Sequence, residues 1–207
     1  MRILYIDTSS SYLYSGIVQD DKLLCEIKKD FGQELSKVAL PEIAKLFDIC
    51  RIKPNDIDKI IVVNGPGSFT GIRIGITIAK VFAWSLNLPI TTITSLEAMM
   101  LSSNVKTNYI PLIDARRSYV FAAIYSEEKK QILKPQHIKI EDLEKEITKL
   151  DNYIIISNDD IEISGKIEKY TPNILKIAQY FKNKQCINPH AVNPDYLKLT
   201  EAEESKL

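Results

Sequence analysis

Two short loops carry the side chains best suited to chemistry, and each follows a strand that ends in an aspartate. The first loop reads Asp7-Thr8-Ser9-Ser10 and the second reads Asp114-Ala115-Arg116-Arg117. A strand-end aspartate before a tight loop is one way to hold phosphate oxygens on backbone N–H groups. That close approach needs glycine, and neither loop contains one. We therefore interpret both as degenerate phosphate loops and expect no bound cofactor.

The two aspartates leave a second interpretation open. Either carboxylate could hold a metal-bound water, but a strand-end aspartate more often accepts hydrogen bonds from its own loop. The two histidines, His137 and His190, lie far apart and form no H-x-x-x-H or H-E-x-x-H pair. The sequence therefore predicts no metal site and no catalytic set of residues.

A glycine-rich run, 65–75, joins an apolar strand at 59–64 to an apolar segment that ends near Asn87. It matches neither G-x-x-x-x-G-K-S/T nor G-x-G-x-x-G, so it is not a recognised nucleotide-binding motif. We interpret it as a tight turn before a helix over 70–87, with Ser68 or Thr70 as the N-cap. Ser68 lacks the G-x-S-x-G setting of a nucleophile, which also favours a capping role.

One pattern of strands occurs twice. Strand 2–7, an alternating segment over 12–19 and a strand over 23–27 are matched by segments 109–114, 119–125 and 131–133. The spacing from Asp7 to Asp20 (20 − 7 = 13) equals that from Asp114 to Glu127 (127 − 114 = 13). The repetition predicts a tandem duplication of a three-stranded unit. A chance similarity between two hairpins is the alternative.

Helices and further strands follow each three-stranded unit. After the first we expect a helix over 34–50, a strand over 59–64, a helix over 70–87, a strand over 89–92 and a short helix from Ser95. After the second we expect a helix over 141–150, a strand over 153–157 and a helix over 173–183. This order predicts an α/β protein with two small lobes, residues 1–103 and a shortened 104–207. It is the layout of the actin-like ATPase (ASKHA, ribonuclease H-like) fold, with a duplicated βββαβα unit.

Composition limits the classes of function. The chain has 207 residues, and its 27 Lys and Arg balance its 27 Asp and Glu, which argues against a large basic surface although a local patch remains compatible. The cysteines at 25, 50 and 186 have no metal-ligand spacing, and we interpret them as small buried apolar residues in a reducing compartment. No stretch reaches the roughly 20 apolar residues that span a bilayer. We expect a cytoplasmic protein without a membrane partner.

The two longest predicted helices are more apolar than a helix lying on one sheet requires. Gly71, Gly75 and Ala79 recur at every fourth position, and small residues at that spacing allow another backbone to approach closely. We therefore predict a partner interface on the two helices; the alternative is that both pack only within their own lobe. The predicted interface residues are Leu35, Ala39, Ile43, Leu46, Phe47, Cys50, Gly71, Arg73, Ile74, Gly75, Ile78, Ala79 and Phe82.

Several strings also match a known family. They are GPGSFTGIRIG at 65–75, ILYIDTSS at 3–10, LPEIAKLF at 40–47, IDARR at 113–117 and NPDYLKL at 193–199. Together they resemble the TsaB (YeaZ) family from Arg2 to about Leu199. One departure is visible, since family members often carry a histidine before the first long helix, where this chain has Leu35. A role attached to that histidine does not transfer to this chain.

The resemblance implies an actin-like fold that has lost its own active site. A member of this family is expected to be a non-catalytic subunit that dimerises with its paralogue TsaD through the helices over 34–50 and 70–87. TsaD transfers threonylcarbamoyl to adenosine in the anticodon loop of tRNAs that read ANN codons. The ATPase TsaE joins the pair, tRNA is met only through the complex, and a homodimer is expected when the chain is alone.

Two alternatives come from other classes of function. One is a small ATP-dependent phosphotransferase with the same fold and an unusual nucleotide site. The other is a metal-dependent, glycoprotease-like peptidase, which the lack of a metal pair in the sequence does not favour.

Overall fold

The computed structural model describes residues 1–198, which form two compact units. Unit 1 comprises Met1–Ser95 together with Pro172–Asp195, and unit 2 comprises Leu96–Thr171 and, of the described residues, 196–198. This division differs from a boundary at residue 103, because Pro172–Asp195 belongs to unit 1. The last part of the expected second lobe, 199–207, lies outside the described residues.

Unit 1 is built on a five-stranded sheet of order β3-β2-β1-β4-β5. Its strands are β1 (Arg2–Asp7), β2 (Tyr12–Gln19), β3 (Lys22–Asp30), β4 (Lys59–Val63) and β5 (Ile90–Ile93). The first three pair antiparallel, whereas β1, β4 and β5 run parallel. Because β1 and β4 are parallel, their C-terminal ends lie together at one edge of the sheet. Asp7 is the last residue of β1, and the glycine-rich run follows β4 at the same edge.

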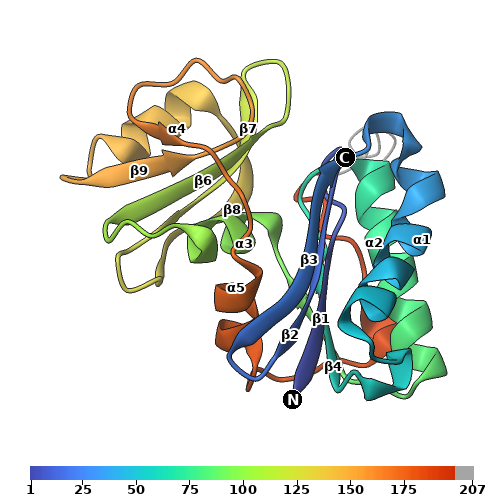
Figure 1. Cartoon of the computed structure of the whole chain (residues 1–207). Helices are drawn as coiled ribbons and strands as arrows, with labels where there is room; N and C mark the ends of the chain where they lie inside the picture. Colours follow the sequence, from blue (N-terminus) through green and yellow to red (C-terminus); the bar gives the residue numbers. More distant parts are fainter. Residues whose placement is uncertain (199–207) are drawn as a thin grey trace. The chain divides into compact units, whose positions relative to one another are not determined.

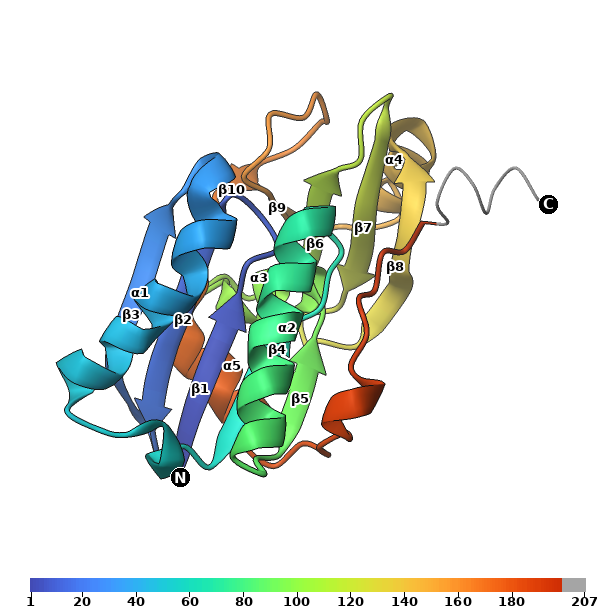
Figure 2. The ribbon, with the colours of Figure 1, turned by 90° about the vertical axis from the view of Figure 1, so that its right-hand side faces the viewer.

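Helices cover both faces of this sheet. Figures 1 and 2 show α1 (Leu35–Cys50) and α2 (Phe69–Ser85) side by side on one face, with α5 (Ile174–Phe181) on the other. Short 3-10 turns flank these helices at Gly32–Glu34, Pro54–Asp56 and Pro189–Ala191. The buried Lys59 donates hydrogen bonds to the carbonyl oxygens of Phe181 (2.7 Å) and Lys184 (3.0 Å), which satisfies the end of α5.

Unit 2 repeats the same plan, which confirms the predicted duplication and the actin-like α/β fold. Its sheet has the order β10-β9-β6-β7-β8, so β8-β7-β6-β9-β10 corresponds to β3-β2-β1-β4-β5. The strands are β6 (Asn108–Asp114), β7 (Tyr119–Tyr125), β8 (Gln131–Lys139), β9 (Tyr153–Ile156) and β10 (Ile167–Glu168). In both units the first three strands are antiparallel and the remaining pairs are parallel. The helices α3 (Ser95–Ser102) and α4 (Ile140–Ile147) complete the described elements.

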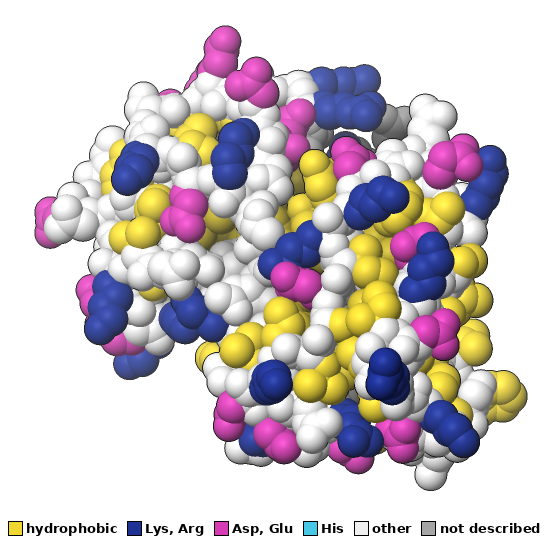
Figure 3. All heavy atoms as spheres, viewed as in Figure 1, with side chains coloured by type: hydrophobic (Ala, Val, Ile, Leu, Met, Phe, Trp, Pro, Cys, Tyr) yellow, Lys and Arg dark blue, Asp and Glu magenta, His cyan; other side chains and the backbone are white. Residues whose placement is uncertain are grey.

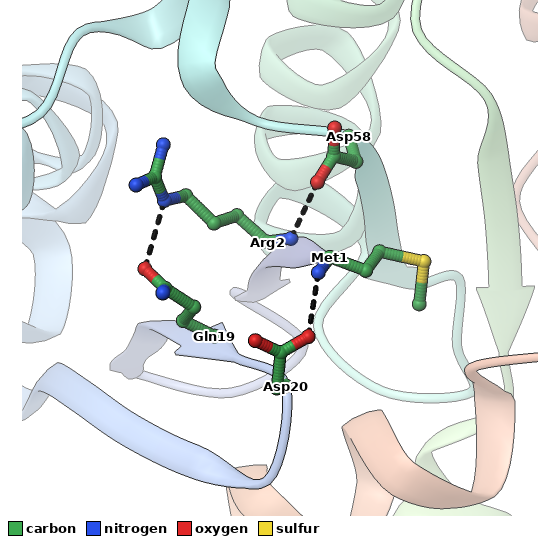
Figure 4. A network of polar contacts seen from close by, with 5 residues as sticks. All are labelled: Met1, Arg2, Gln19, Asp20 and Asp58. Atoms are coloured by element: carbon green, nitrogen blue, oxygen red, sulfur yellow. Dashed lines mark hydrogen bonds and ion pairs between the residues drawn. The ribbon is translucent and has the colours of Figure 1, made fainter.

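A polar network fastens the start of β1 (Figure 4). The Met1 amino group pairs with Asp20 at 2.6 Å, and the Arg2 N–H donates to Asp58 at 2.6 Å. The Arg2 side chain also donates to Gln19 at 2.9 Å. The first strand is thereby tied to the end of β2 and to the segment before β4, which fixes where Asp7 emerges.

The cysteines differ from the expectation of buried, reduced thiols. Cys25 on β3 and Cys50, the last residue of α1, form a disulfide with their Cα atoms 6.5 Å apart, and Cys186 is free and exposed. The prediction was wrong for the first two because α1 packs along β3, which brings distant sequence positions together. Within residues 1–198 no helix is long and apolar enough to cross a membrane.

Candidate functional site

The first aspartate loop is closed onto the turn that starts α2. The Asp7 carboxylate accepts hydrogen bonds from the N–H (2.9 Å) and Oγ (2.7 Å) of Ser9. The Ser9 carbonyl accepts the Ser68 N–H at 2.7 Å, and the Thr8 hydroxyl donates to the Gly71 carbonyl at 2.7 Å. The N–H group of Ser9, which a phosphate would need, is already used within the protein. Burial raises the pKa of Asp7, and the hydrogen bonds from Ser9 oppose that rise.

In the second loop, as in the first, the strand-end aspartate accepts a backbone N–H from its own loop. The Asp114 carboxylate accepts the Arg116 N–H at 2.8 Å, just as Asp7 accepts the N–H two residues further along. The Ala115 N–H donates to the Tyr119 carbonyl, and the Asp114 N–H donates to Asp159. Both strand-end aspartates therefore hold their own loops, as the more common interpretation predicted.

The small residues of α2 face the sheet of unit 1. A Cβ atom added at Gly71 would collide with the Thr8 carbonyl oxygen, and one added at Gly75 would collide with the Thr8 hydroxyl. Ala79 is fully buried in the same core. These three residues were predicted to receive a partner's backbone, but the close approach they allow is to β1 and its loop. The Ser68 Oγ accepts the Gly71 N–H, which confirms the predicted N-cap.

The apolar stripe of α1 also points inward. Leu35, Ala39, Ile43, Leu46 and Phe47 are all at most 5% exposed and belong to the core of unit 1. Because their side chains fill the core of their own unit, they offer a partner almost no surface, and their role in the interface stays a prediction. They are buried because α1 packs against two strands, β2 and β3, and its apolar stripe is the side that faces them. Cys50 is half-buried and held in the disulfide.

The remaining predicted interface residues lie nearer the surface. Arg73 is exposed, and its guanidinium carbon lies 3.9 Å from the centre of the Phe69 ring. Ile74, Ile78 and Phe82 are half-buried, and the Phe82 ring stacks against Phe47 with centroids 6.0 Å apart.

Large apolar side chains that the prediction omitted are exposed on the same two helices. Trp84 is 71% exposed, and Phe69, Val81, Leu40 and Ile49 are 48–66% exposed. Figure 3 shows hydrophobic side chains gathered along the right-hand edge, over α1 and α2. We call these five residues the outer helix face. The sequence does indicate them, because they are apolar residues of the two helices that lie outside the stripes packed against the sheet.

A pocket of about 370 Å³ opens beside the start of α2. Its wall carries hydroxyl and amide groups beside the apolar side chains of Leu35 and Ile74, and it has no ionisable side chain. The lining residues are Ser10, Ser11, Gly32, Gln33, Leu35, Ser36, Ser68, Thr70, Gly71 and Ile74. Within residues 1–198 no group of three or more His, Cys, Asp or Glu residues is placed to hold a metal ion.

Comparison with known proteins places this geometry in a family. Residues 29–204 match the family model described as TsaD, tRNA N6-adenosine threonylcarbamoyltransferase. The Bacillus subtilis protein named tRNA threonylcarbamoyladenosine biosynthesis protein TsaB is 31% identical over 98% of this chain and 96% of its own length. This chain belongs to the TsaB family. The Escherichia coli TsaB protein is 30% identical over 66% of this chain and 64% of its own.

Solved structures agree with the TsaB fold. YeaZ from Pseudomonas aeruginosa superimposes with a TM-score of 0.76 at 16% identity, over 95% of this chain and 99% of that chain. A second Pseudomonas aeruginosa structure, described as an uncharacterized protein with similarity to peptidase YeaZ, has a TM-score of 0.78 at 16% identity. It also covers 95% of this chain and 99% of its own. At this identity the likeness concerns the fold alone.

Proposed function

We propose that this chain is a non-catalytic subunit that docks onto a TsaD-type paralogue and supports its transfer of threonylcarbamoyl to tRNA. The observation that carries the proposal is the outer helix face on a chain of the TsaB family. Five large apolar side chains are exposed on two neighbouring helices, and exposed apolar surface on a helix pair is a feature of protein contacts. Fully burying each one contributes roughly 1.5 to 3 kcal/mol before the costs of association.

Several finer points belong to the same proposal. The paralogue's own α/β unit offers a similar pair of helices, so docking makes a four-helix contact, and a second copy of this chain occupies the face when the partner is absent. A TsaE-type ATPase joins the pair, and the substrate is tRNA that reads ANN codons. These events take place in the cytoplasm, where such tRNA is present.

The absence of catalysis in this chain is supported by its two loops and its pocket. Backbone N–H groups of both aspartate loops are used by internal acceptors. The pocket beside α2 has no ionisable side chain that would act as a general acid or base. These observations give no support to the phosphotransferase or the peptidase.

Co-elution with a purified TsaD-type partner tests the docking surface. The double substitution Val81→Asp/Trp84→Asp should lower the affinity at least 100-fold, because two charges would be buried in an apolar contact. The thermal midpoint of the chain alone should stay within about 2 °C, since both residues are exposed. A matched control is Ile132→Asp, which places a charge at an exposed isoleucine on β8 in unit 2. Full co-elution of the double variant would exclude the outer helix face as the contact.

A further inference from the structure

Unit 2 carries a second surface, on which cationic side chains lie beside aromatic rings. The proposed function assigns no role to this surface. The surface, here named the β7–β8 face, consists of Arg116, Arg117, Tyr119, Phe121, His137 and Lys139. We propose that the β7–β8 face binds tRNA, with its cations on phosphate groups and its rings against bases. This inference rests on the proposed function and deepens it, because it assigns an RNA contact to this chain rather than to its partner alone.

Strand pairing brings the four strand residues onto one side of the sheet. Tyr119 lies directly opposite Lys139, and Phe121 lies directly opposite His137. Side chains alternate along a strand, so the residues between them, Val120 among others, point to the opposite side. That opposite side packs against α4 in the core of unit 2. The β7–β8 face is therefore not covered by α4.

The rings on this face form a connected cluster that remains partly exposed. Tyr119 and His137 stack with centroids 4.5 Å apart and an interplanar angle of 11°. Phe121 lies against the same imidazole at 5.4 Å, and the Lys139 ammonium is 5.9 Å from the Tyr119 ring. All three rings are only half-buried. Aromatic rings on a sheet surface with cations at their edge are the features by which proteins bind single-stranded RNA.

The adjoining loop presents two arginines to solvent. Arg116, Arg117 and Ser118 all have left-handed φ values, 66°, 54° and 61°, which side-chain-bearing residues seldom adopt in succession. Backbone hydrogen bonds hold this shape, since the Tyr119 N–H donates to the Arg116 carbonyl and the Ile140 N–H donates to the Ser118 carbonyl. The second bond fastens the loop to the end of β8, next to Lys139. The two arginines and Lys139 are thus held at one end of the sheet.

The charges of this region favour an anionic ligand. Both arginines and Lys139 are exposed, and none pairs with a carboxylate within residues 1–198. Of the neighbouring carboxylates, Asp114 and Asp159 accept backbone N–H groups, and Asp142 pairs with Lys145 while Lys139 adds a weaker attraction. The chain as a whole is neutral, so three cations without carboxylate partners on one face are not a consequence of its composition. RNA offers phosphates and flat bases together, which matches both components of the face.

Binding of a fluorescent tRNA transcript, followed by anisotropy over a range of salt concentrations, tests the cationic part. The isolated chain should bind weakly at about 50 mM salt, and its complex with the partner should bind more tightly. Arg116→Ala/Arg117→Ala should weaken both at least tenfold and reduce the slope of log affinity against log salt by about 2. Lys129→Ala/Lys130→Ala removes the same charge from the exposed turn at the far end of the hairpin, and it should stay within twofold.

The aromatic part has a different signature. Tyr119→Leu keeps an apolar side chain of similar bulk but removes the ring, so it should weaken tRNA binding about fivefold or more. The salt slope should stay unchanged, because no cation is lost. A general loss of folding would instead lower the thermal midpoint, which is measured on the same sample.

The outcomes separate this inference from the proposed function. If the wild-type chain fails to co-elute with its partner while the arginine variant still loses tRNA affinity, the proposed function falls and the β7–β8 face stands. If the arginine variant co-elutes and binds tRNA as the wild type does, the RNA contact is wrong. Displacement of tRNA by polyglutamate at an equal concentration of charge would overturn it as well, since the face would then bind any polyanion.

Discussion

Asp7 lies buried at the end of β1, where its carboxylate takes both hydrogen bonds that Ser9 donates. Burial raises the pKa of this carboxyl above its usual range despite those bonds. The folded state therefore binds a proton on the Asp7 carboxyl more tightly than the unfolded chain does, in which an aspartate titrates at about pH 4. This difference between the folded and unfolded pKa of Asp7 stabilises the folded state. The stabilisation is fully present below about pH 4 and is lost as the pH rises through the folded pKa.

Asp7→Asn should consequently be more stable than the wild type at pH 7, and the difference should vanish toward pH 4. The amide oxygen of asparagine keeps both bonds from Ser9, while the buried charge is removed. Urea unfolding at pH 4, 5, 6 and 7 measures the effect, with Asp151→Asn at an exposed position as the control. A wild type whose stability relative to Asp7→Asn does not change with pH would show that Asp7 is not desolvated.

Gly75 is the residue at which the sequence prediction and the structure differ most. Gly75 belongs to the partner interface predicted from the sequence, yet a Cβ atom at this position would meet the Thr8 hydroxyl inside unit 1. Gly75→Ala should therefore lower the free energy of unfolding by about 1 to 3 kcal/mol through overpacking. Thr77→Ala, at an exposed position two residues further along α2, should change it by less than about 0.5 kcal/mol. Equal stability of the glycine variant and the wild type would refute the close packing of α2 on β1.

The sequence identified the loops and the cap correctly but could not orient the helices. Hydrogen bonds within a loop, such as those of Asp7 and Asp114, follow from local residue types. Helical spacing groups residues onto a face without saying whether the sheet or a partner lies against it. Small residues such as Gly75 allow a close approach in either case. The outer helix face was therefore missed, although Val81 and Trp84 lie on the same helix.

At the scale of elements, repetition made the fold predictable. The expected strand–helix order matches the structure, and most boundaries differ by one to three residues; for example α2 spans Phe69–Ser85 rather than 70–87. The exception is β8, which was expected over 131–133 and spans Gln131–Lys139. The two-residue strand β10 was missed because so short a segment has no periodicity. The return of α5 to unit 1 was also missed. That packing depends on long-range contacts, including the hydrogen bonds of Lys59, which no local pattern records.

The disulfide between β3 and α1 gives a prediction about these elements. It joins residues 25 positions apart, and a loop of that length corresponds to about 3.5 kcal/mol of stabilisation. Adding a reductant should lower the midpoint of thermal unfolding for the wild type but not for Cys25→Ser/Cys50→Ser. Cys186→Ser should respond as the wild type does, because that thiol is free. Three titratable thiols in the oxidised, unfolded wild type, instead of one, would show that the bond does not form.

At the scale of the whole molecule, two duplicated units have kept the actin-like plan while their loops serve the fold. The Asp7 loop is closed onto α2, and the Asp114 loop presents arginines instead of a phosphate cradle. The exposed surfaces are consistent with a supporting role, since unit 1 carries the outer helix face and unit 2 carries the β7–β8 face. We expect each surface to contact a different partner. Substitutions on one surface leave the residues of the other unchanged, so the two contacts can be tested separately.

The central claim is that the chain supports a reaction that its partner performs. Its most direct measurement is the formation of threonylcarbamoyladenosine in a tRNA transcript, with the TsaD-type partner, the ATPase and the threonylcarbamoyl donor supplied in purified form. We expect no product from this chain without its partner, and at least tenfold more product from the mixture with this chain than without it. Val81→Asp/Trp84→Asp should abolish that gain. Product formed by this chain alone, or equal product when it is omitted, would contradict the account.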